Sequence, residues 1–317
     1  MLIIHSNAMN VKKKIYSNLI LCVLLFSFAQ NLYAQNQTSN TDLPSDINTK
    51  LKVVSSFFPI DQFVRKIGGD TVETSILVPV GVEPHDFEPT INQIQTVDSA
   101  HVLVYNGLGI ENWIDKINTK YKIDASKGLN ATYADKRNMT LDPHVWLDPL
   151  LVKKQVVNIR DGLTMIDPKN KDIYYNNANN FLNELDNLDK EIRTDLESCK
   201  KKDFIAFHNS FSYFAKEYGL YQHSITNIGP EAEVTPTRWA EIINTAKSLG
   251  LSVIYSEELI DPRYANVIAQ EIPDGKVLVL SPIEGLTKNE QDSGIGYIDK
   301  MHENMKNLMV GLDCNNK

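Results

Sequence analysis

The sequence contains little cysteine. Only three of the 317 residues are cysteine, and they are Cys22, Cys199 and Cys314. No two of them share a short metal-binding spacing, so a thiolate zinc site and an iron–sulfur cluster are excluded. Cys22 lies inside an apolar run near the N-terminus. The sequence leaves open whether Cys199 and Cys314 form a disulfide or remain two free thiols.

Basic residues are also scarce. The chain has 32 Lys and Arg against 40 Asp and Glu, a net charge of −8. Nucleic-acid binding needs a basic face, so no nucleic-acid partner is expected. An uninterrupted apolar run of the ~20 residues that a membrane span requires is missing as well. With 42% hydrophobic and 23% charged residues, the composition excludes a fully disordered chain and a polytopic membrane protein.

Sequence motifs of common enzymes are missing too. We find no H-E-x-x-H helix, no nucleophile triad and no phosphate-binding glycine loop. Residues 107–109 read Gly-Leu-Gly, but they lack the third glycine and the strand-to-helix context of a dinucleotide site. These absences favour a binding protein over an enzyme.

The N-terminus has the pattern of a secretory signal. Three lysines at 12–14 precede an apolar run at 19–28, and small residues follow at Ala29 and Ala34. We assign residues 1–34 to a signal peptide, with an uncleaved signal anchor as the alternative. Cleavage would leave 283 residues and, by removing three Lys and no acidic residue, change the net charge from −8 to −11.

Residues 35–50 are rich in Asn, Gln, Ser, Thr and Asp, which predicts a flexible tether rather than part of a core. We therefore expect an exported protein, in the periplasm or at the cell surface. If the signal is not cleaved, this segment is expected to tether the protein to the membrane.

From residue 51 the chain alternates between strand and helix patterns. The expected strands of the first half are 52–57, 72–78 and 102–105, and the expected helices are 59–67 and 90–99. After residue 200 the expected strands are 204–207, 221–225, 253–255 and 277–280, with helices at 212–218, 237–249, 264–270 and from Tyr297. This alternation predicts an α/β protein with two lobes, residues 51–166 and 201–317, each a parallel β-sheet flanked by helices.

Residues 167–200 between the two lobes predict one long helix. Asp167 and Pro168 form an N-cap and first-turn pair. Apolar residues then recur at helical spacing, at Tyr174, Ala178, Phe181, Leu185, Leu188, Ile192 and Leu196. Such a helix, ~45 Å long, would be a rigid connector that permits only small lobe movements.

Three of the seven histidines stand in an unusual setting. His85 and His144 lie in proline-flanked loops, and His85 and His208 follow expected strands, where ligands of parallel sheets bind. His5 leaves with the signal, and His101, His223 and His302 have ordinary surroundings. Three neutral imidazoles would suit Zn²⁺ better than Ca²⁺ or Mg²⁺. Spacing alone leaves a metal site undecided, because no two of these histidines are close in sequence.

Several spaced motifs resemble the solute-binding proteins of zinc and manganese ABC transporters. They are GVEPHDFEP at 81–89, YNGLGIENW at 105–113, DPHVWLDP at 142–149, FHNSF at 207–211, GPEAEVTP at 229–236 and YSE at 255–257. The resemblance extends from about residue 51 to the C-terminus, with the motifs in the order of the family.

This resemblance implies one metal in the interlobe cleft, held by His85, His144 and His208. The family usually has a fourth ligand, an Asp, where this chain has Ser281, so Glu284, Ser281 or a water is expected to complete the site. A histidine at position 208 favours Zn²⁺, with Mn²⁺ as the second candidate. The implied partners are an ABC permease and its ATPase, the implied protein is a monomeric receptor, and the implied processes are metal-ion transport and cell adhesion.

Two other functions remain open from the sequence. A zinc-dependent hydrolase could use the same three histidines with Glu83, Glu88 or Glu257 as general base. The other is a receptor for a chelated metal. The same three glutamates could instead fix the tautomer of a metal-bound imidazole.

Overall fold

The computed structural model describes residues 50–135, 139–227, 229 and 234–315. The expected signal peptide and residues 35–49 of the expected tether lie outside these described residues, as do residues 230–233 of one motif. In the part of the chain that the structure describes, no helix is both long and apolar enough to cross a membrane.

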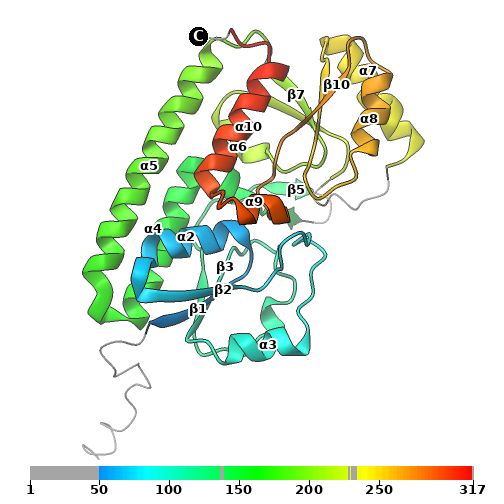
Figure 1. Ribbon diagram of the computed structural model, residues 1–317. Helices are drawn as coiled ribbons and strands as arrows, with labels where there is room; N and C mark the ends of the chain where they lie inside the picture. The colour runs from blue at the N-terminus through cyan, green and yellow to red at the C-terminus, as the bar shows by residue number, and fades with distance from the viewer. Residues whose placement is uncertain (1–49, 136–138, 228, 230–233, 316–317) are drawn as a thin grey trace, which may run out of the picture. The chain divides into compact units, whose positions relative to one another are not determined.

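The N-terminal lobe is built on a four-stranded parallel sheet in the order β2-β1-β3-β4. Its strands are β1 (Leu51–Ser55), β2 (Val72–Ile76), β3 (Val102–Tyr105) and β4 (Lys122–Asp124), and its helices are α2 (Phe58–Gly68) and α3 (Ile91–Asp98). Val54, Leu103 and Trp113 belong to the apolar core beneath this sheet. Figure 1 shows α2 and α3 on either side of it.

The C-terminal lobe repeats this plan with the order β10-β9-β7-β8, again parallel. The strands are β7 (Asp203–Ala206), β8 (Tyr221–Ser224), β9 (Val253–Ser256) and β10 (Lys276–Val279). The helices are α6 (Ser212–Glu217), α7 (Pro236–Leu249), α8 (Arg263–Gln270), α9 (Lys288–Asp292) and α10 (Tyr297–Gly311). The predicted fold class, two lobes with parallel sheets flanked by helices, is confirmed.

A short antiparallel ribbon, the edge strand β4 and the helices α4 (Pro149–Ile166) and α9 were not expected from the sequence. β5 (Tyr133–Asp135) pairs with β6 (Thr140–Leu141), and α4 follows the second histidine motif. α4 begins at a proline, and the Asp148 side chain caps it by accepting a hydrogen bond from the Leu150 N–H.

The long connecting helix is α5 (Lys171–Glu197), and its helical segment begins at Pro168 as predicted, although the first turn is 3₁₀ and the predicted side-chain cap is missing. Asp167 does not cap it. A 3₁₀ turn, Pro168–Asn170, intervenes, and the Asp167 carboxylate accepts hydrogen bonds from the Asn170 amide and the Tyr174 hydroxyl instead. Every residue of the predicted apolar stripe is buried.

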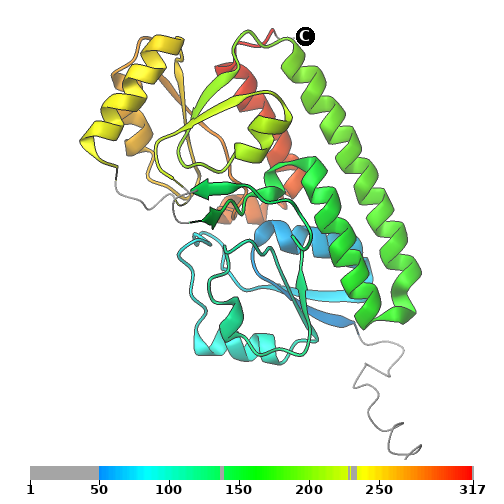
Figure 2. The same cartoon turned by 180° about the vertical axis from the view of Figure 1, so that it is seen from behind.

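α5 packs against α4 and α2 and also contacts α10, so it joins both lobes (Figures 1 and 2). A disulfide between Cys199 and Cys314 links the segment after α5 to the segment after α10. The sequence had left this pairing open. Both ends of the C-terminal lobe are therefore attached to the connector.

Candidate metal centre

Each candidate ligand lies on a loop that follows a sheet strand or precedes a helix. His85 lies between β2 and α3, and His144 lies between β6 and α4. His208 lies two residues after the end of β7, and Glu284 lies between β10 and α9. Two residues therefore come from each lobe, and three follow the carboxyl ends of parallel strands, where ligands of α/β folds bind.

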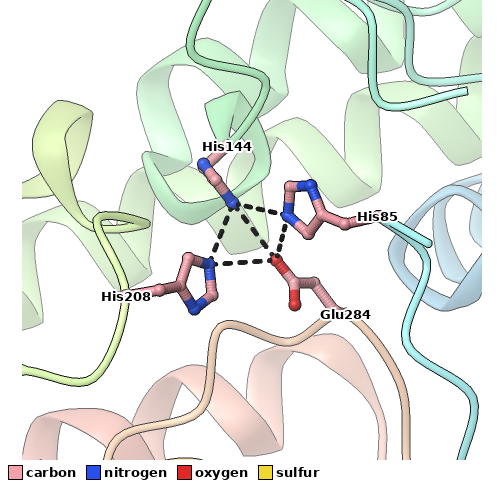
Figure 3. Close-up of side chains that lie close together, drawn as sticks. All are labelled: His85, His144, His208 and Glu284. Carbon is pink, nitrogen blue, oxygen red and sulfur yellow. Dashed lines mark hydrogen bonds and ion pairs between the residues drawn. The ribbon is translucent and has the colours of Figure 1, made fainter. Parts of the chain in front are cut away.

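These four side chains converge on one point (Figure 3). The Nε2 atom of His144 is 3.2 Å from His85 Nε2 and 3.1 Å from His208 Nε2. The Oε1 atom of Glu284 is 3.2 Å from Nε2 of His85, 3.2 Å from Nε2 of His144 and 3.4 Å from Nε2 of His208. All four ligand atoms lie within 4.8 Å of one another.

The spacing of these atoms fits a tetrahedral zinc ion. Bonds of ~2.0–2.1 Å to zinc place neighbouring ligand atoms of a tetrahedron ~3.3–3.4 Å apart. Five of the six pairs of ligand atoms lie 3.1–3.4 Å apart. The site can therefore accept zinc with little movement of the side chains.

Two carboxylates orient two of the imidazoles. Asp142 Oδ1 lies 2.8 Å from His144 Nδ1, and Glu257 Oε1 lies 2.7 Å from His208 Nδ1. Each carboxylate also accepts a hydrogen bond from the backbone N–H of its histidine. An Nδ1–H donated to the carboxylate leaves the Nε2 lone pair facing the centre, which is the tautomer a metal needs.

This role was expected for Glu257 but not for Asp142. Asp142 precedes His144 by two residues in the quoted motif, and that short spacing is the signal that could have identified it.

The other two glutamates considered as general bases are placed differently. Glu88 is an exposed residue that pairs with Lys116 at 2.9 Å. Glu83 accepts the backbone N–H of His85 at 3.2 Å. Burial, together with repulsion from Glu284, raises the pKa of Glu83 to about 9. A carboxyl group that is protonated at neutral pH is a poor general base.

The ligand atoms are almost completely removed from solvent. The side chains of His144 and His208 are 0% exposed and that of Glu284 is 1% exposed, whereas His85 is 11% exposed. A cleft of about 620 Å³ is lined by His85, Leu108, Lys127 and Pro143, among others. His85 therefore stands between the centre and the solvent.

The pKa values of the four candidate ligands are shifted in different directions. Burial alone would lower the pKa of His208, but the carboxylates of Glu257 and Glu284 outweigh it and hold that pKa well above 6.5. Burial is likewise outweighed at His144, mainly by Asp142, and its pKa is raised. Burial prevails at His85, whose pKa is lowered. The three imidazoles overcome burial at Glu284 and keep its pKa well below 4.5.

Ser281, the other candidate for a fourth ligand, is occupied elsewhere. Its hydroxyl accepts a hydrogen bond from the Ile283 N–H at 3.1 Å, and its backbone N–H bonds Asn304 at 2.7 Å. Glu284, not Ser281, belongs to the convergent group.

The segment at 105–113 supports the loop of His144. The buried Glu111 accepts the backbone N–H groups of Asn106 and Gly107 at 2.8 and 2.9 Å. The Asn106 amide then donates to the Pro143 carbonyl, next to His144. Burial raises the pKa of Glu111 to about 7. This network explains why a motif with no ligand belongs to the site.

The remaining described histidines bond away from the centre. His101 Nδ1 accepts the backbone N–H of Lys52, His223 pairs with Asp203, and His302 pairs with Glu191. Their ordinary surroundings agree with the sequence analysis.

The known proteins that resemble this chain in sequence are named as zinc-uptake or zinc-binding proteins. Residues 53–311 match the family described as zinc-uptake complex component A, periplasmic (ZnuA). The high-affinity zinc uptake system protein ZnuA of Bacillus subtilis (strain 168) is 36% identical over 281 residues, 83% of this chain and 88% of that protein. Zinc-binding protein AdcA of Streptococcus pyogenes serotype M18 is 33% identical over 295 residues, 84% of this chain. The chain spans only 57% of that longer protein.

Solved structures agree with the sequence relatives. The Zn(II)-bound ZnuA-like domain of Streptococcus pneumoniae AdcA matches with a TM-score of 0.74 and 32% identity, covering 84% of this chain and 100% of that domain. Laminin binding protein of Streptococcus agalactiae, described as bifunctional with adhesin and metal transporting activity, matches with a TM-score of 0.77 and 30% identity. That match covers 83% of this chain and 100% of the other.

Proposed function

Because the chain belongs to the periplasmic zinc-uptake component A family, we propose that it is the extracytoplasmic zinc receptor of an ABC importer. In this proposal His85, His144, His208 and Glu284 bind one Zn²⁺, which the protein delivers to a membrane permease and its ATPase. The observation that carries the proposal is the convergence of three imidazole nitrogens and one carboxylate oxygen within 4.8 Å.

The donor set favours Zn²⁺ over Mn²⁺ as the cargo. Imidazole nitrogen suits zinc, whereas manganese prefers carboxylate, carbonyl and water oxygens. Three of the four candidate ligands are imidazoles, and five of the six distances between ligand atoms, 3.1–3.4 Å, match those around a tetrahedral zinc ion. We therefore propose zinc as the ion carried.

Both alternative functions have less support. Catalytic zinc keeps three protein ligands and an open position for water, whereas non-catalytic zinc is enclosed by four. In our proposal Glu284, whose side chain is 1% exposed, takes the fourth position. A chelator bound to the metal would need the same position. We therefore propose a receptor for the free ion and not an enzyme.

Uptake of radioactive zinc tests this function. A strain that lacks the gene is expected to lose zinc uptake at limiting zinc, and the wild-type gene should restore it. The His208→Ala variant should be exported in equal amount and fail to restore uptake. Full uptake with His208→Ala would contradict the proposal.

For capture and release we propose that residues 51–166 and 201–317 act as lobes joined by the connecting segment 167–200. α5 is buried along one full face and contacts helices of both lobes. Wide opening would expose that apolar face to water, so release by loop movement and small tilts costs less.

The expected result is a small change in overall dimensions on zinc binding. Small-angle scattering of the apo and the zinc-loaded protein should give radii of gyration that differ by less than about 1 Å. A difference of several ångströms would show that the connector bends and would contradict this account of release.

The identity of the fourth ligand predicts different effects for two neighbouring substitutions. Glu284→Gln removes the negative charge and should weaken zinc binding by about 10- to 100-fold. Ser281→Ala should change zinc affinity by less than about twofold, because the Ser281 hydroxyl bonds the Ile283 N–H. Competition with a chromogenic chelator measures both. A greater loss with Ser281→Ala than with Glu284→Gln would make the hydroxyl the ligand.

A further inference from the structure

One face of α10 carries three buried polar side chains. Tyr297, Lys300 and Asn304 are 2%, 1% and 5% exposed. Their spacings of three and four residues place them on the same side of the helix. None of them belongs to the convergent metal group, so their burial requires another explanation.

Asn304 holds the backbone of the loop that carries Glu284. Its amide oxygen accepts the Ser281 N–H, and its amide nitrogen donates to the Ser281 carbonyl, both at 2.7 Å. Ser281 precedes Glu284 by three residues. Both backbone polar groups of Ser281 are thus fixed by one side chain of α10.

Tyr297 holds the loop that carries His144. Its hydroxyl donates to the carbonyl of Trp146 at 2.7 Å. Trp146 in turn donates its indole N–H to the Pro282 carbonyl at 2.7 Å. The same hydrogen-bonded chain therefore joins the loop of His144 to the loop of Glu284 across the two lobes.

Lys300 binds a residue next to the carboxylate that orients His208. Its ammonium group lies 2.5 Å from Glu258 and 2.7 Å from Glu290. Glu258 directly follows Glu257, the carboxylate that orients His208. The charge of Lys300 is buried, and the acidic partners around it compensate for its loss of hydration.

We propose that this face of α10, defined by Tyr297, Lys300 and Asn304, positions the ligands from three separate loops for zinc. This inference rests on the proposed zinc-binding function and adds to it the residues that position the ligands. These side chains touch no metal ligand atom; they act through the backbone of residues 146 and 281 and through the carboxylate of Glu258. Zinc affinity then depends on hydrogen bonds outside the ligand set.

α10 is itself attached to the connector at two places. His302 Nε2 lies 3.0 Å from Glu191 Oε2 on α5, and the Cys199–Cys314 disulfide joins the segments beyond the ends of the two helices. The face of α10 that carries Tyr297, Lys300 and Asn304 is therefore held against the connector by contacts outside the metal site.

Two substitutions test the proposal, and a third serves as a matched control. Asn304→Leu removes both hydrogen bonds to Ser281 at similar side-chain volume, and Tyr297→Phe removes only the hydroxyl. Asn307→Leu is the control, because Asn307 also donates to a backbone carbonyl, that of Val279, at 2.8 Å. Val279 is the last residue of β10 and lies outside the ligand loops. Lys300 is a poor probe, because its removal would leave the partly buried carboxylates of Glu258 and Glu290 without their cation.

Zinc dissociation constants, measured by chelator competition well below the melting temperature of each apo protein, are the first readout. Asn304→Leu and Tyr297→Phe should each weaken zinc binding by about tenfold, equivalent to ~1.4 kcal/mol. Asn307→Leu should weaken it by less than about twofold. The second readout is the visible absorption of Co²⁺ bound in place of zinc, which should lose tetrahedral intensity in the first two variants only.

The outcomes separate this inference from the proposed function. Equal zinc affinities for Asn304→Leu and Asn307→Leu, or lower apo stability with unchanged affinity and Co²⁺ spectrum, would reduce the face to a structural role and overturn the inference. Wild-type protein that failed to bind zinc would overturn the proposed function itself.

Discussion

The His208→Ala variant is expected to lose zinc affinity by about 100- to 1,000-fold. Four ligands together supply about 10–16 kcal/mol in small zinc sites, roughly 2.5–4 kcal/mol each. His208 is fully buried and its Nε2 lies 3.1 Å from that of His144 and 3.4 Å from Glu284 Oε1. Alanine removes a ligand whose place no other described side chain in the group can take.

Isothermal titration or chelator competition measures this loss, and two variants calibrate it. Glu257→Gln should weaken zinc binding by about 10- to 100-fold, because Glu257 only orients the imidazole of His208. His223→Ala is the matched control. His223 also pairs with a carboxylate, that of Asp203, but it does not belong to the convergent metal group. Zinc affinity within threefold of wild type for His208→Ala would exclude His208 as a ligand.

Zinc affinity is also expected to fall steeply as the pH is lowered from 7.5 to 5.5. Zinc needs neutral imidazoles, so a proton and the ion compete for each Nε2. The pKa values of His208 and His144 are raised by their carboxylates, so both already bind protons at pH values above 6.5. Burial lowers the pKa of His85 below 6.5, so its proton competes with zinc less than those of the other two imidazoles.

The sign and size of the pH effect follow from these directions. Each displaced proton weakens zinc binding up to tenfold per pH unit, so two protons give about 10- to 100-fold per unit. The pKa of Glu284 is well below 4.5, and its carboxylate contributes no proton here. Asp142→Asn should flatten the dependence, because its loss lowers the pKa of His144. A zinc affinity independent of pH between 7.5 and 5.5 would contradict the assignment.

The elements of the fold were predictable because each has a strong local pattern. Alternating apolar strands and amphipathic helices identified both parallel sheets except the short edge strand β4, and the stripe from Tyr174 to Leu196 identified α5. The helical start at Pro168 was predictable from local sequence, but the 3₁₀ first turn and the role of Asp167 were not. The Asp167 carboxylate accepts hydrogen bonds from the side chains of Asn170 and Tyr174 instead of a backbone N–H of the first turn.

The candidate site was only partly predictable. Histidines beyond strand ends suggested His85 and His208, but the convergence of residues up to 199 positions apart depends on the relative placement of two lobes. Glu284 could not be separated from Ser281 by sequence, since the distinction depends on which side chain points toward the imidazoles. The contacts of Trp146 and Asn304 with the Pro282 and Ser281 backbones have no sequence signature at all.

The most direct test of the central claim is a crystal structure of the zinc-loaded protein with anomalous data collected on both sides of the zinc absorption edge. The account predicts one strong zinc peak, ~2.0–2.1 Å from Nε2 of His85, His144 and His208 and from a carboxylate oxygen of Glu284. A peak elsewhere, or zinc bound to fewer than three of these histidines, would contradict it.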